Sequence, residues 1–558
     1  MPGLPNRAQQ RCYVALFIDA MDLHLNIFAN KLNTDYLARP CSTRYQVHPA
    51  LFSKCALKCS TFCQSIIVGL GLVPYFVDTL GLAAYGLIPL ATSITSYVTL
   101  IIDSLNTSIS RFLTIDLQRS DIVRANQTFN TALFGTLAII LVLIPIVLLV
   151  AWFAPDFFDI GNTASSDVFI LFSLILGSVL IRAWSSNFMV TLFAHNRLDY
   201  RNLVNIANLA TQLILVIIFF TFFSPSLVYV GISYFAAALV ALFLAYHLSR
   251  KVCPDLHISV SSYSHARFGE IGGIAFWVTI DTIGFMLNAN IALMVVNRLF
   301  GAVAGSEYSL VMLWSTLLYG ISGLVTTAMT PMIYNYYSRR DTAGLIKFGL
   351  FAMKCTALFM APIIGLICLF SPQLFTIWMG SDEFVHLAPL VWIVLSPVIV
   401  KAQISAIGSI SVGYGKVKIP AFLTLFTGIL NVYLSFTLPF MFGLGIYGVA
   451  ISGAITMILH TGINVPLYAA YLVHAPLSTF LKAILKGVGY LAGFVAVGIL
   501  MLTVFPVSNI IMSIVIGSAL LIGYAALALT RILHKDEKKQ LRSCLPAILS
   551  RHIPTWIL

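Results

Sequence analysis

Four charged residues lie deep inside long apolar stretches of this 558-residue sequence: the cations Arg182 and Lys401 and the acids Asp103 and Asp281. A charge inside a membrane is costly unless it is paired or lies in a hydrated cavity. Two hypotheses follow. In the structural one, each acid pairs with one cation, Asp103 with Arg182 and Asp281 with Lys401. In the functional one, some of the four face a cleft, where they bind an anionic head group or carry protons.

No catalytic or metal-binding motif accompanies these charges. The sequence contains no HExxH, GxxxxGK[ST] or paired CxxC pattern. The 9 cysteines show no paired spacing, and Cys55, Cys59 and Cys63 recur every four residues, which is typical of an apolar stripe on one helical face. We therefore expect a protein that is not an enzyme, with no catalytic residue, no metal and no cofactor.

The composition indicates the elements that carry the four charges. Hydrophobic residues make up 59% of the chain and charged residues 9%, against about 25% charged in a soluble domain. A membrane-spanning helix needs about 20 apolar residues. We predict an all-α polytopic membrane protein with about fourteen spans, at 57–77, 86–110, 129–153, 167–192, 202–223, 226–248, 271–296, 309–335, 346–370, 387–413, 419–440, 445–472, 482–505 and 509–532.

The positions of lysine and arginine predict the topology. Of the 32 such residues, 28 fall on one side of the predicted membrane and one, Arg298, falls on the other. The positive side of a membrane protein faces the cytoplasm. We expect a multi-pass protein of the cytoplasmic (inner) membrane with both termini in the cytoplasm. The net charge of +12 then reflects topology, and no nucleic-acid partner is expected.

An internal repeat appears when the chain is compared with itself at an offset of about 219. Gly161 then matches Gly380, and Arg182 matches Lys401. Further matches at offsets of 217 to 219 are Pro155, Phe158 and Ile160 with Pro372, Phe375 and Ile377, and Ile232-Ser233 with Ile451-Ser452. Six spans per repeat predict two parallel-related six-helix bundles, with a cleft between them that suits alternating access.

The repeat predicts the domain organisation. We expect a cytoplasmic N-terminal extension of unknown role at 1–50, an N-terminal bundle at 51–250, a C-terminal bundle at 251–475, spans 13 and 14 at 476–533 and a cytoplasmic tail at 534–558.

Several short motifs suggest a family. The segment from Pro74 to Leu87, with Leu80-Gly81 and Tyr85-Gly86-Leu87, is followed by Asp103 and Arg111. It resembles the opening of the polysaccharide and O-antigen flippases, which belong to the multidrug/oligosaccharidyl-lipid/polysaccharide exporter superfamily. Tyr447-Gly448 and Ile451-Ser452-Gly453 resemble the glycine-rich start of span 12 in the same proteins. The resemblance covers about residues 52–535.

The resemblance implies translocation of a polyprenyl-diphosphate-linked oligosaccharide across the cytoplasmic membrane by alternating access, for polysaccharide or O-antigen biosynthesis. In such proteins spans 1, 2, 7 and 8 line the cleft. Those spans offer Gln64, Asp103, Asn106, Asp281, Asn288, Asn290 and Trp314, with Arg298 at the outer mouth. This set departs from the arginine-rich cavity of the lipid II flippase relatives and favours contact with a less charged glycan.

The expected partners are the lipid-linked oligosaccharide, the bilayer, polysaccharide assembly proteins and a coupling proton or sodium ion carried by Asp103 or Asp281. The alternative within transport is a multidrug and toxin extrusion cation antiporter, which would use the same acids for ion coupling. A membrane glycosyltransferase is less well supported, because the longest predicted loop, about 249–270, holds only Asp255 and Glu270 as acids.

Overall fold

The computed structural model describes residues 70–119, 121–195, 197–414, 416, 418–505, 510–534 and 537–538. The regular elements among these residues are helical. The N-terminal half begins with a helix over Leu70–Leu80 and continues through α3 (Leu82–Gln118), α4 (Ile122–Phe157), α5 (Ser165–Ala194), α6 (Leu198–Phe222) and α7 (Leu227–Val252). Most of the predicted first span, Gln64 and residues 1–50 lie outside the described residues.

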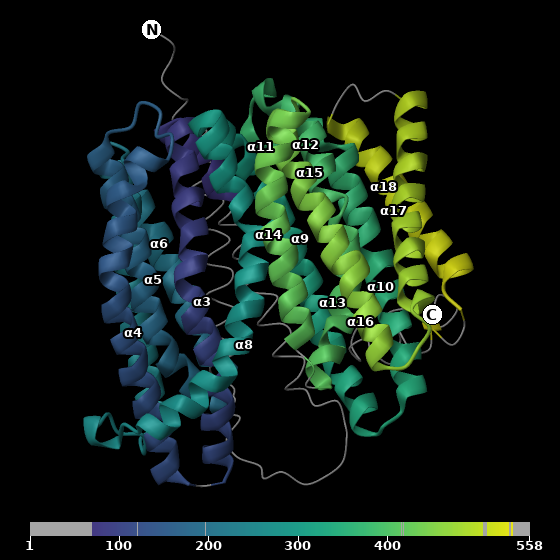
Figure 1. The fold of residues 1–558 in the computed structure, drawn as a ribbon. Helices are drawn as coiled ribbons and strands as arrows, with labels where there is room; N and C mark the ends of the chain where they lie inside the picture. The colour runs from purple at the N-terminus through teal and green to yellow at the C-terminus, as the bar shows by residue number, and fades with distance from the viewer. Residues whose placement is uncertain are drawn as a thin grey trace, which may run out of the picture.

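The C-terminal half stands beside the first in Figure 1. It comprises η1 (Val260–Ser262), α8 (His265–Ala289), α9 (Ile291–Ser338), α10 (Thr342–Leu369), α11 (Ser371–Met379), η2 (Asp382–Leu387), α12 (Ala388–Leu395), α13 (Val398–Gly413), α14 (Lys418–Met441), α15 (Gly445–Met457), the π-helix η3 (Ile458–Asn464) and α16 (Val465–Leu472). Two further helices follow, α17 (Ser478–Val504) and α18 (Ile510–Leu527), and α18 continues into the π-helical segment η4 (Ala528–Ile532).

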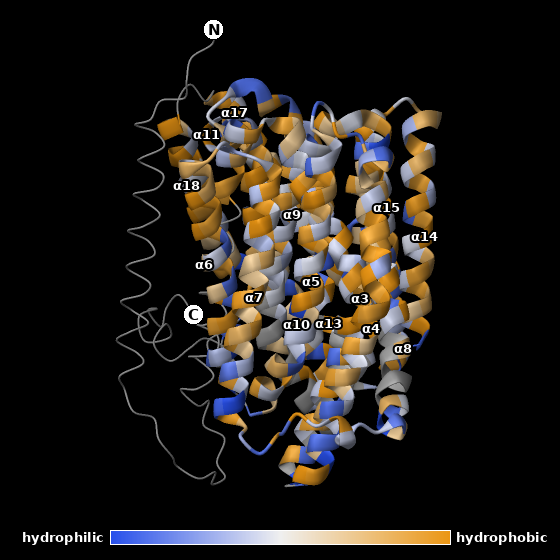
Figure 2. Ribbon diagram, turned by 90° about the vertical axis from the view of Figure 1, so that its left-hand side faces the viewer, coloured by the Kyte–Doolittle hydropathy of each residue, from blue (hydrophilic) through white to orange (hydrophobic). Residues whose placement is uncertain are grey.

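The described residues contain 12 helices that are long and apolar enough to cross a membrane. Their outer surfaces are apolar as well: Leu141, Val142 and Trp152 of α4 are 60%, 65% and 67% exposed, as expected for side chains that face lipid. Figure 2 shows hydrophobic residues along the middle of the helices and hydrophilic ones gathered towards both ends. The prediction of an all-α polytopic membrane protein is confirmed.

The structure narrows the break predicted between spans 7 and 8, at residues 297–308, to a single turn. The helical stretch Thr279–Gly323 overlaps both predicted spans and is apolar enough by length and composition to cross a membrane. The chain turns within it at Gly301, whose φ of 92° and ψ of 172° are not helical. Glycine allows this turn because it lacks a Cβ. The first helix of the C-terminal half also starts early, at His265, because the hydroxyl of Ser264 accepts a hydrogen bond from the Arg267 amide and caps it.

The internal repeat is visible in the helix boundaries. Three helices of the first half have an equivalent helix in the second half whose first residue lies 218 to 220 positions later. The paired first residues are Ile122 of α4 and Thr342 of α10, Leu198 of α6 and Lys418 of α14, and Leu227 of α7 and Gly445 of α15. Asp121 and Asp341 cap equivalent helices, with φ of −86° and −87°, by accepting from the amides of Arg124 and Gly344. Both halves therefore share one backbone plan.

Turn glycines follow the same repeat. Gly161 and Gly380, which the sequence comparison matched, both have left-handed backbone, with φ of 56° and 69°. Gly81, which ends the first described helix, has φ of 84° and corresponds to Gly301 in the second half. A residue with a Cβ is strained in this region, so the same turns demand glycine in both halves.

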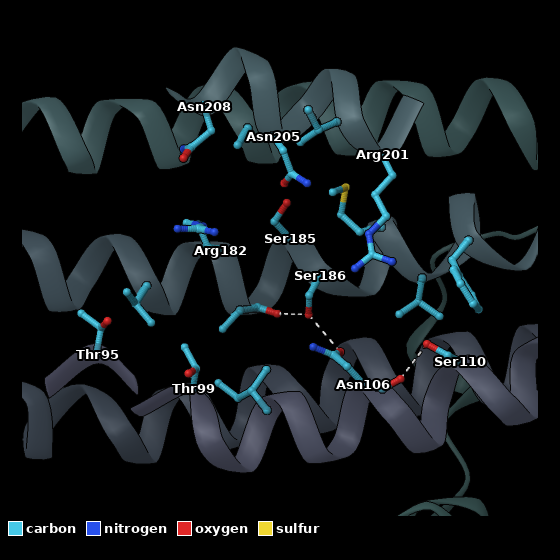
Figure 3. Close-up of a pocket in the computed structure, with 18 residues that line it drawn as sticks. Thr95, Thr99, Asn106, Ser110, Arg182, Ser185, Ser186, Arg201, Asn205 and Asn208 are labelled. Atoms are coloured by element: carbon cyan, nitrogen blue, oxygen red, sulfur yellow. Dashed lines mark hydrogen bonds between the residues drawn. The ribbon is translucent and has the colours of Figure 1, made fainter. Parts of the chain in front are cut away.

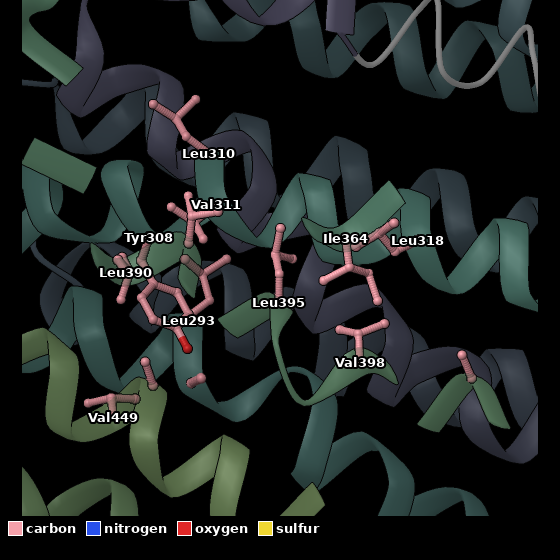
Figure 4. Packing of buried hydrophobic residues seen from close by; sticks show 14 of the residues in the cluster. Leu293, Tyr308, Leu310, Val311, Leu318, Ile364, Leu390, Leu395, Val398 and Val449 are labelled. Atoms are coloured by element: carbon pink, nitrogen blue, oxygen red, sulfur yellow. The ribbon is translucent and has the colours of Figure 1, made fainter. Parts of the chain in front are cut away.

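The two halves share an apolar core at the upper end of Figure 1, where α3 begins. Leu87 and Leu90, early in α3, belong to one buried cluster with Leu293 and Tyr308 of α9. Figure 4 shows the part of this cluster that the C-terminal half contributes. The approach is close, because Ser306 of α9 occupies the space next to Gly86 of α3.

A hydrogen-bonded clamp reinforces the upper end. The carboxylate of Asp159, just after α4, accepts from the amides of Gly161 and Ala302 at 3.0 Å each. The Asn297 side chain of α9 accepts from the Asp159 amide and donates to its carbonyl, both at 3.1 Å. The clamp therefore ties the end of α4 to the turn at Gly301.

The lower end, where α3 finishes, is organised differently. Leu105 and Leu113, late in α3, belong to a second buried cluster with Phe129 and Phe188 of the N-terminal half. Here the start of α8 reaches the N-terminal half through Arg267. Its guanidinium donates to Asp116 of α3 at 2.6 Å and to Thr128 of α4 at 3.0 Å, and both side chains of the ion pair are buried. Apolar packing joins the halves above. Below, they are joined by this polar latch of Arg267, Asp116 and Thr128, beside which Phe268 of α8 packs against Gly135 of α4.

Candidate functional site

A polar cavity of about 600 Å³ lies inside the N-terminal half. Figure 3 shows α5 between α3 and α6 along its length. The lining residues of α3 are Thr95, Thr99, Asn106 and Ser110, which follow one another after four, seven and four residues. Because these intervals are close to one or two helical turns, the four side chains lie on one face of α3. The described polar residues that line the cavity are Thr95, Thr99, Asn106 and Ser110 of α3, Arg182, Ser185 and Ser186 of α5, and Arg201, Asn205 and Asn208 of α6.

Two of the predicted site residues meet in this cavity. Asn106 accepts a hydrogen bond from Ser186 at 3.0 Å, and the Arg182 side chain is exposed to the cavity nearby. No described acid forms an ion pair with Arg182. The side chain of Asp103 lies outside the described residues, so the proposed Asp103–Arg182 pair stays a prediction.

A second polar cluster lies in the C-terminal half, between α8, α14 and η3. Asp281 of α8 is exposed, and its carboxylate accepts from Thr424 of α14 at 2.9 Å. The same hydroxyl lies 3.5 Å from Nε2 of His460. Asn288, two turns further along α8, donates to the Gly284 carbonyl at 2.9 Å and reaches Thr424 and the neighbouring Thr427 at 3.5 Å. Asp281 and Asn288 therefore face α14 together.

The backbone supplies the unusual position of His460. This residue lies in the π-helix η3, within an otherwise α-helical crossing from Gly445 to Leu472. Single π-helical turns inside α-helices are frequent at functional sites, because the extra residue redirects side chains. The Nδ1 atom of His460 is buried without a partner in the described part of the chain. The cluster thus holds one carboxylate, one hydroxyl and one imidazole within reach of each other.

Lys401 is placed against aromatic rings. Its ammonium lies 3.7 Å from the ring centre of Tyr319 and 4.7 Å from that of Phe285. Such distances give cation–π stabilisation, which does not require a carboxylate. Among the described ion pairs, none joins Lys401 to Asp281. The structure therefore shows an aromatic partner for Lys401 where the sequence suggested an acidic one.

The remaining predicted cleft residues are dispersed. Arg298 is exposed and lies 5.4 Å from the ring centre of Phe157. Trp314 makes an edge contact with Trp378, with ring centres 5.4 Å apart. Asn290 donates to the sulfur of Met286 at 3.2 Å. Within the described residues these three do not join either polar cluster.

Sequence reasoning missed several residues that the fold brings together. Arg201, Asn205 and Asn208 lie three or four residues apart, a helical stripe of polar residues that could have indicated a cavity face on α6. Thr424 gave no comparable signal, because hydroxyls are common inside membrane helices, whereas His460 is an ionisable residue inside a predicted span and could have been singled out. Neither cluster resembles a metal site, and no group of three or more His, Cys, Asp or Glu that could hold a metal occurs among the described residues.

Comparisons with known proteins relate the chain to polysaccharide synthesis. Residues 59–336, about half of the chain, match the family model described as "Polysaccharide biosynthesis protein". A relative from Bacillus subtilis (strain 168), named "Uncharacterized membrane protein EpsK", is 26% identical over 428 residues, which cover 76% of this chain and 84% of the relative.

Solved structures of similar fold are membrane transporters. The structure titled "Lipid II flippase MurJ, inward closed conformation" matches with a TM-score of 0.64 and 15% identity, over 86% of this chain and 100% of the other. An inward-facing multidrug resistance transporter of the MATE family, in the MOP superfamily, matches with a TM-score of 0.61 and 14% identity, over 75% and 98% of the two chains. At these identities the likeness concerns the fold.

Proposed function

Because the chain belongs to the polysaccharide biosynthesis proteins of flippase type within the multidrug/oligosaccharidyl-lipid/polysaccharide exporter superfamily, we propose that it flips a polyprenyl-diphosphate-linked oligosaccharide across the cytoplasmic membrane. The substrate would enter from the cytoplasmic leaflet and leave in the outer one. Both termini would lie in the cytoplasm, on the side of the membrane where α5 ends and α6 begins. Polysaccharide assembly proteins would supply and consume the substrate.

The observation that carries the proposal is the uneven joining of the two halves. They share a continuous apolar core at the upper end, through Leu87, Leu90 and Tyr308, whereas the lower half of α3 packs in a cluster of its own. A diphosphate and several sugars cannot cross hydrocarbon unaided, because burying unpaired charges and hydroxyls is too costly. The shared apolar core closes the path between the halves at the upper end, and a polar cavity lies further down. This arrangement supports assignment of the structure to one state of an alternating-access cycle.

The proposal is tested by depleting the protein in its native cell. We expect loss of surface polysaccharide and accumulation of the complete lipid-linked oligosaccharide, held on the cytoplasmic side and resistant to glycosidases added to intact cells. A cation antiporter would behave differently: its depletion would raise the cellular content of lipophilic cations and leave the surface glycan unchanged. That second result would contradict the proposal.

The orientation has its own test. Single cysteines introduced in the loops at 156–165 and 381–386 should react with a membrane-impermeant maleimide added to intact cells, whereas a cysteine in place of Asp341 should not. Asp341 caps α10 at the opposite end of the helix from the 381–386 loop. Labelling of position 341 from outside would reverse the proposed direction of transport.

Asp281 is the residue proposed to couple transport to a proton or sodium gradient. Its carboxylate is exposed at membrane depth and is held by Thr424 rather than by a cation. A group in this position can exchange its charge with the aqueous phase during the cycle. Asp281→Asn, which keeps the shape and removes the charge, should stop accumulation of surface glycan while the protein stays folded in the membrane.

Asp103→Asn is the matched variant for the other half of the protein. If both Asp103→Asn and Asp281→Asn export glycan at the normal rate and with the normal pH dependence, ion coupling through these acids is wrong. The predicted glycan contacts, Gln64, Asn106, Asn288, Asn290, Arg298 and Trp314, are tested separately by alanine variants, which should change the preference among glycans of different length rather than the ion dependence.

A further inference from the structure

The two arginines of the N-terminal cavity have no role in the function proposed so far. Arg182 of α5 and Arg201 of α6 are both exposed, and both line the same polar cavity. We propose that this cavity, which is lined by residues of the N-terminal half, is a binding site for the diphosphate group of a polyprenyl-linked lipid. Identification of that lipid with the exported substrate rests on the proposed function; binding of a diphosphate by the cavity does not.

The arginines lie at two depths along one path. Arg182 precedes Ala194, the last residue of α5, by 12 residues, which is about 18 Å along the helix axis. Arg201 follows Leu198, the first residue of α6, by three residues, about 5 Å. Both helix ends lie at the lower end of the molecule, so Arg201 lies closer to that end than Arg182 does, and both face the cavity (Figure 3). A phosphoryl group moving inwards would meet the two in turn.

The groups between the arginines suit an oxyanion with a sugar attached. Guanidinium groups bind phosphoryl oxygens with two parallel hydrogen bonds, which a point charge cannot do. Asn205, Asn208 and Ser185 supply amides and a hydroxyl, which can donate to phosphoryl oxygens and also accept from sugar hydroxyls. The volume of about 600 Å³ lies in the range of small-molecule sites and exceeds what a bare phosphate fills.

The charge of the cavity selects anions. Among the described residues that line it, two are arginines and none is acidic. A lipophilic cation or a divalent metal would be repelled by this arrangement, whereas a diphosphate would be attracted. Asp103 follows the lining residue Ile102 on α3, and its side chain lies outside the described part of the structure. A pair between Asp103 and Arg182 is therefore the competing explanation that the test must separate.

A nearby arginine provides a matched control. Arg197 lies at the α5–α6 junction, four residues before Arg201, and does not line the cavity. Its guanidinium donates to Asp199 at 2.7 Å and lies 3.9 Å from the ring centre of Tyr200. The hydrogen bond to Asp199 raises the pKa of Arg197 above its usual range. Its charge is thus already neutralised, and its removal should leave diphosphate binding unchanged.

The test measures ligand binding to the purified full-length protein, from the shift in its thermal unfolding midpoint as ligand is added. The probes are inorganic pyrophosphate, farnesyl diphosphate and farnesol. We expect farnesyl diphosphate to stabilise the protein, and we expect Arg182→Gln and Arg201→Gln each to weaken this binding by about tenfold or more, while Arg197→Gln does not. Arg201 is exposed and lies in the first turn of α6, so its variant stays informative if Arg182→Gln folds poorly.

The probes separate the two sources of the anion. Stabilisation by both pyrophosphate and farnesyl diphosphate shows that the diphosphate group suffices, and stabilisation by farnesyl diphosphate alone shows that the group must be attached to a lipid. Either result supports the site if both cavity variants lose it. Equal stabilisation by farnesol, unchanged binding in both cavity variants, or no binding of either diphosphate would overturn it.

Two further outcomes isolate the competing explanations. If Arg182→Gln lowers protein abundance and Asp103→Asn restores it with diphosphate binding intact, then Arg182 forms a structural ion pair with Asp103. In that case Arg182 is not part of the diphosphate site. If binding behaves as expected but depletion of the protein leaves surface glycan unchanged, the flippase function fails while the diphosphate site stands.

Discussion

Arg182 and Lys401 occupy the same position of the internal repeat, 219 residues apart, yet their surroundings differ. Arg182 is exposed in a polar cavity that also contains Arg201. Lys401 lies over the rings of Tyr319 and Phe285. Both halves therefore have a cation at the equivalent position of a helix, but the residues around the two cations differ. In the first half the charge is available to a ligand, and in the second it is engaged by the protein.

The packing around α13 explains part of this difference. α17 lies against α13 and α10, and the approach is so close that Gln403 of α13 fills the space beside Gly487 of α17. Gln403 is fully buried. The two helices beyond the repeat therefore cover the C-terminal half on this side. This support is consistent with the two proposed roles, ion coupling in the C-terminal half and substrate binding in the N-terminal half.

The largest expected effect separates the two cations directly. Arg182→Gln should lower export of glycan by about tenfold or more while the protein keeps its normal abundance, because an exposed charge contributes to ligand binding rather than to packing. Lys401→Gln should leave diphosphate binding unchanged and lower stability by about 0.5 to 2 kcal/mol, the range of cation–π contacts. Export assays and thermal unfolding of both variants check this. The reverse pattern would contradict the comparison.

The next effect concerns the polar latch at the lower end. Arg267→Ala should destabilise the protein by about 3 to 5 kcal/mol, because it leaves the buried carboxylate of Asp116 without its partner. Combining it with Asp116→Asn should recover much of the loss. Glu270→Gln is the control, since the Glu270 side chain is 51% exposed and should contribute less than about 1 kcal/mol. Protein abundance and unfolding midpoints measure all three. Equal effects of Arg267→Ala and Glu270→Gln would show that the latch is not a buried pair.

A smaller effect should distinguish the two equivalent turn glycines. Gly301→Ala combines strained backbone with a clash, because a Cβ there would lie 2.8 Å from the Asp159 carboxylate. We expect a loss of about 1 to 3 kcal/mol from strain alone, increased by displacement of the clamp. Gly81→Ala has open space around it and should lose only about 1 to 2 kcal/mol. Comparison of the two unfolding midpoints tests whether displacement of Asp159 destabilises the protein beyond the backbone strain of the turn. Identical losses of stability in the two variants would show that it does not.

The smallest effect lies at the tail of the second half. Lys354 of α10 donates to Glu537 at 2.7 Å, and Glu537 also accepts from the His534 amide. Burial opposes ionisation of Glu537, but these hydrogen bonds outweigh it and lower its pKa. A lowered folded-state pKa stabilises the folded state at neutral pH, and this contribution disappears as the pH falls through the carboxyl range. Glu537→Gln should cost less than about 1 kcal/mol at pH 7 and nothing under acidic conditions, as measured by unfolding at both pH values.

The sequence predicted the fold through features that depend on local chemistry. Apolar length identified the helices, and the match of Gly161 with Gly380 located turns that require positive φ in both halves. The break between predicted spans 7 and 8, residues 297–308, includes the turn at Gly301. The sequence did not reveal that the helices continue almost up to this glycine on both sides.

The site was harder to predict, because partners on different helices are chosen by packing. Asp281 was identified as an intramembrane charge, but its partner is a threonine on α14 rather than Lys401. Hydroxyls are too common in membrane helices to stand out in a sequence. The sequence places Arg201 among the cytoplasmic cations, and its position in the cavity depends on how α5 packs between α3 and α6.

The central claim is that this protein moves a lipid-linked oligosaccharide between leaflets with its two halves in different roles. The most direct measurement is leaflet-resolved transport in proteoliposomes loaded with a polyprenyl-diphosphate-linked oligosaccharide and probed by a glycosidase added outside. We predict that the wild-type protein and Arg197→Gln expose the oligosaccharide well above protein-free liposomes, and that Arg182→Gln and Asp281→Asn do not. No exposure above protein-free liposomes with wild-type protein, or full exposure with both inactive variants, would contradict the account.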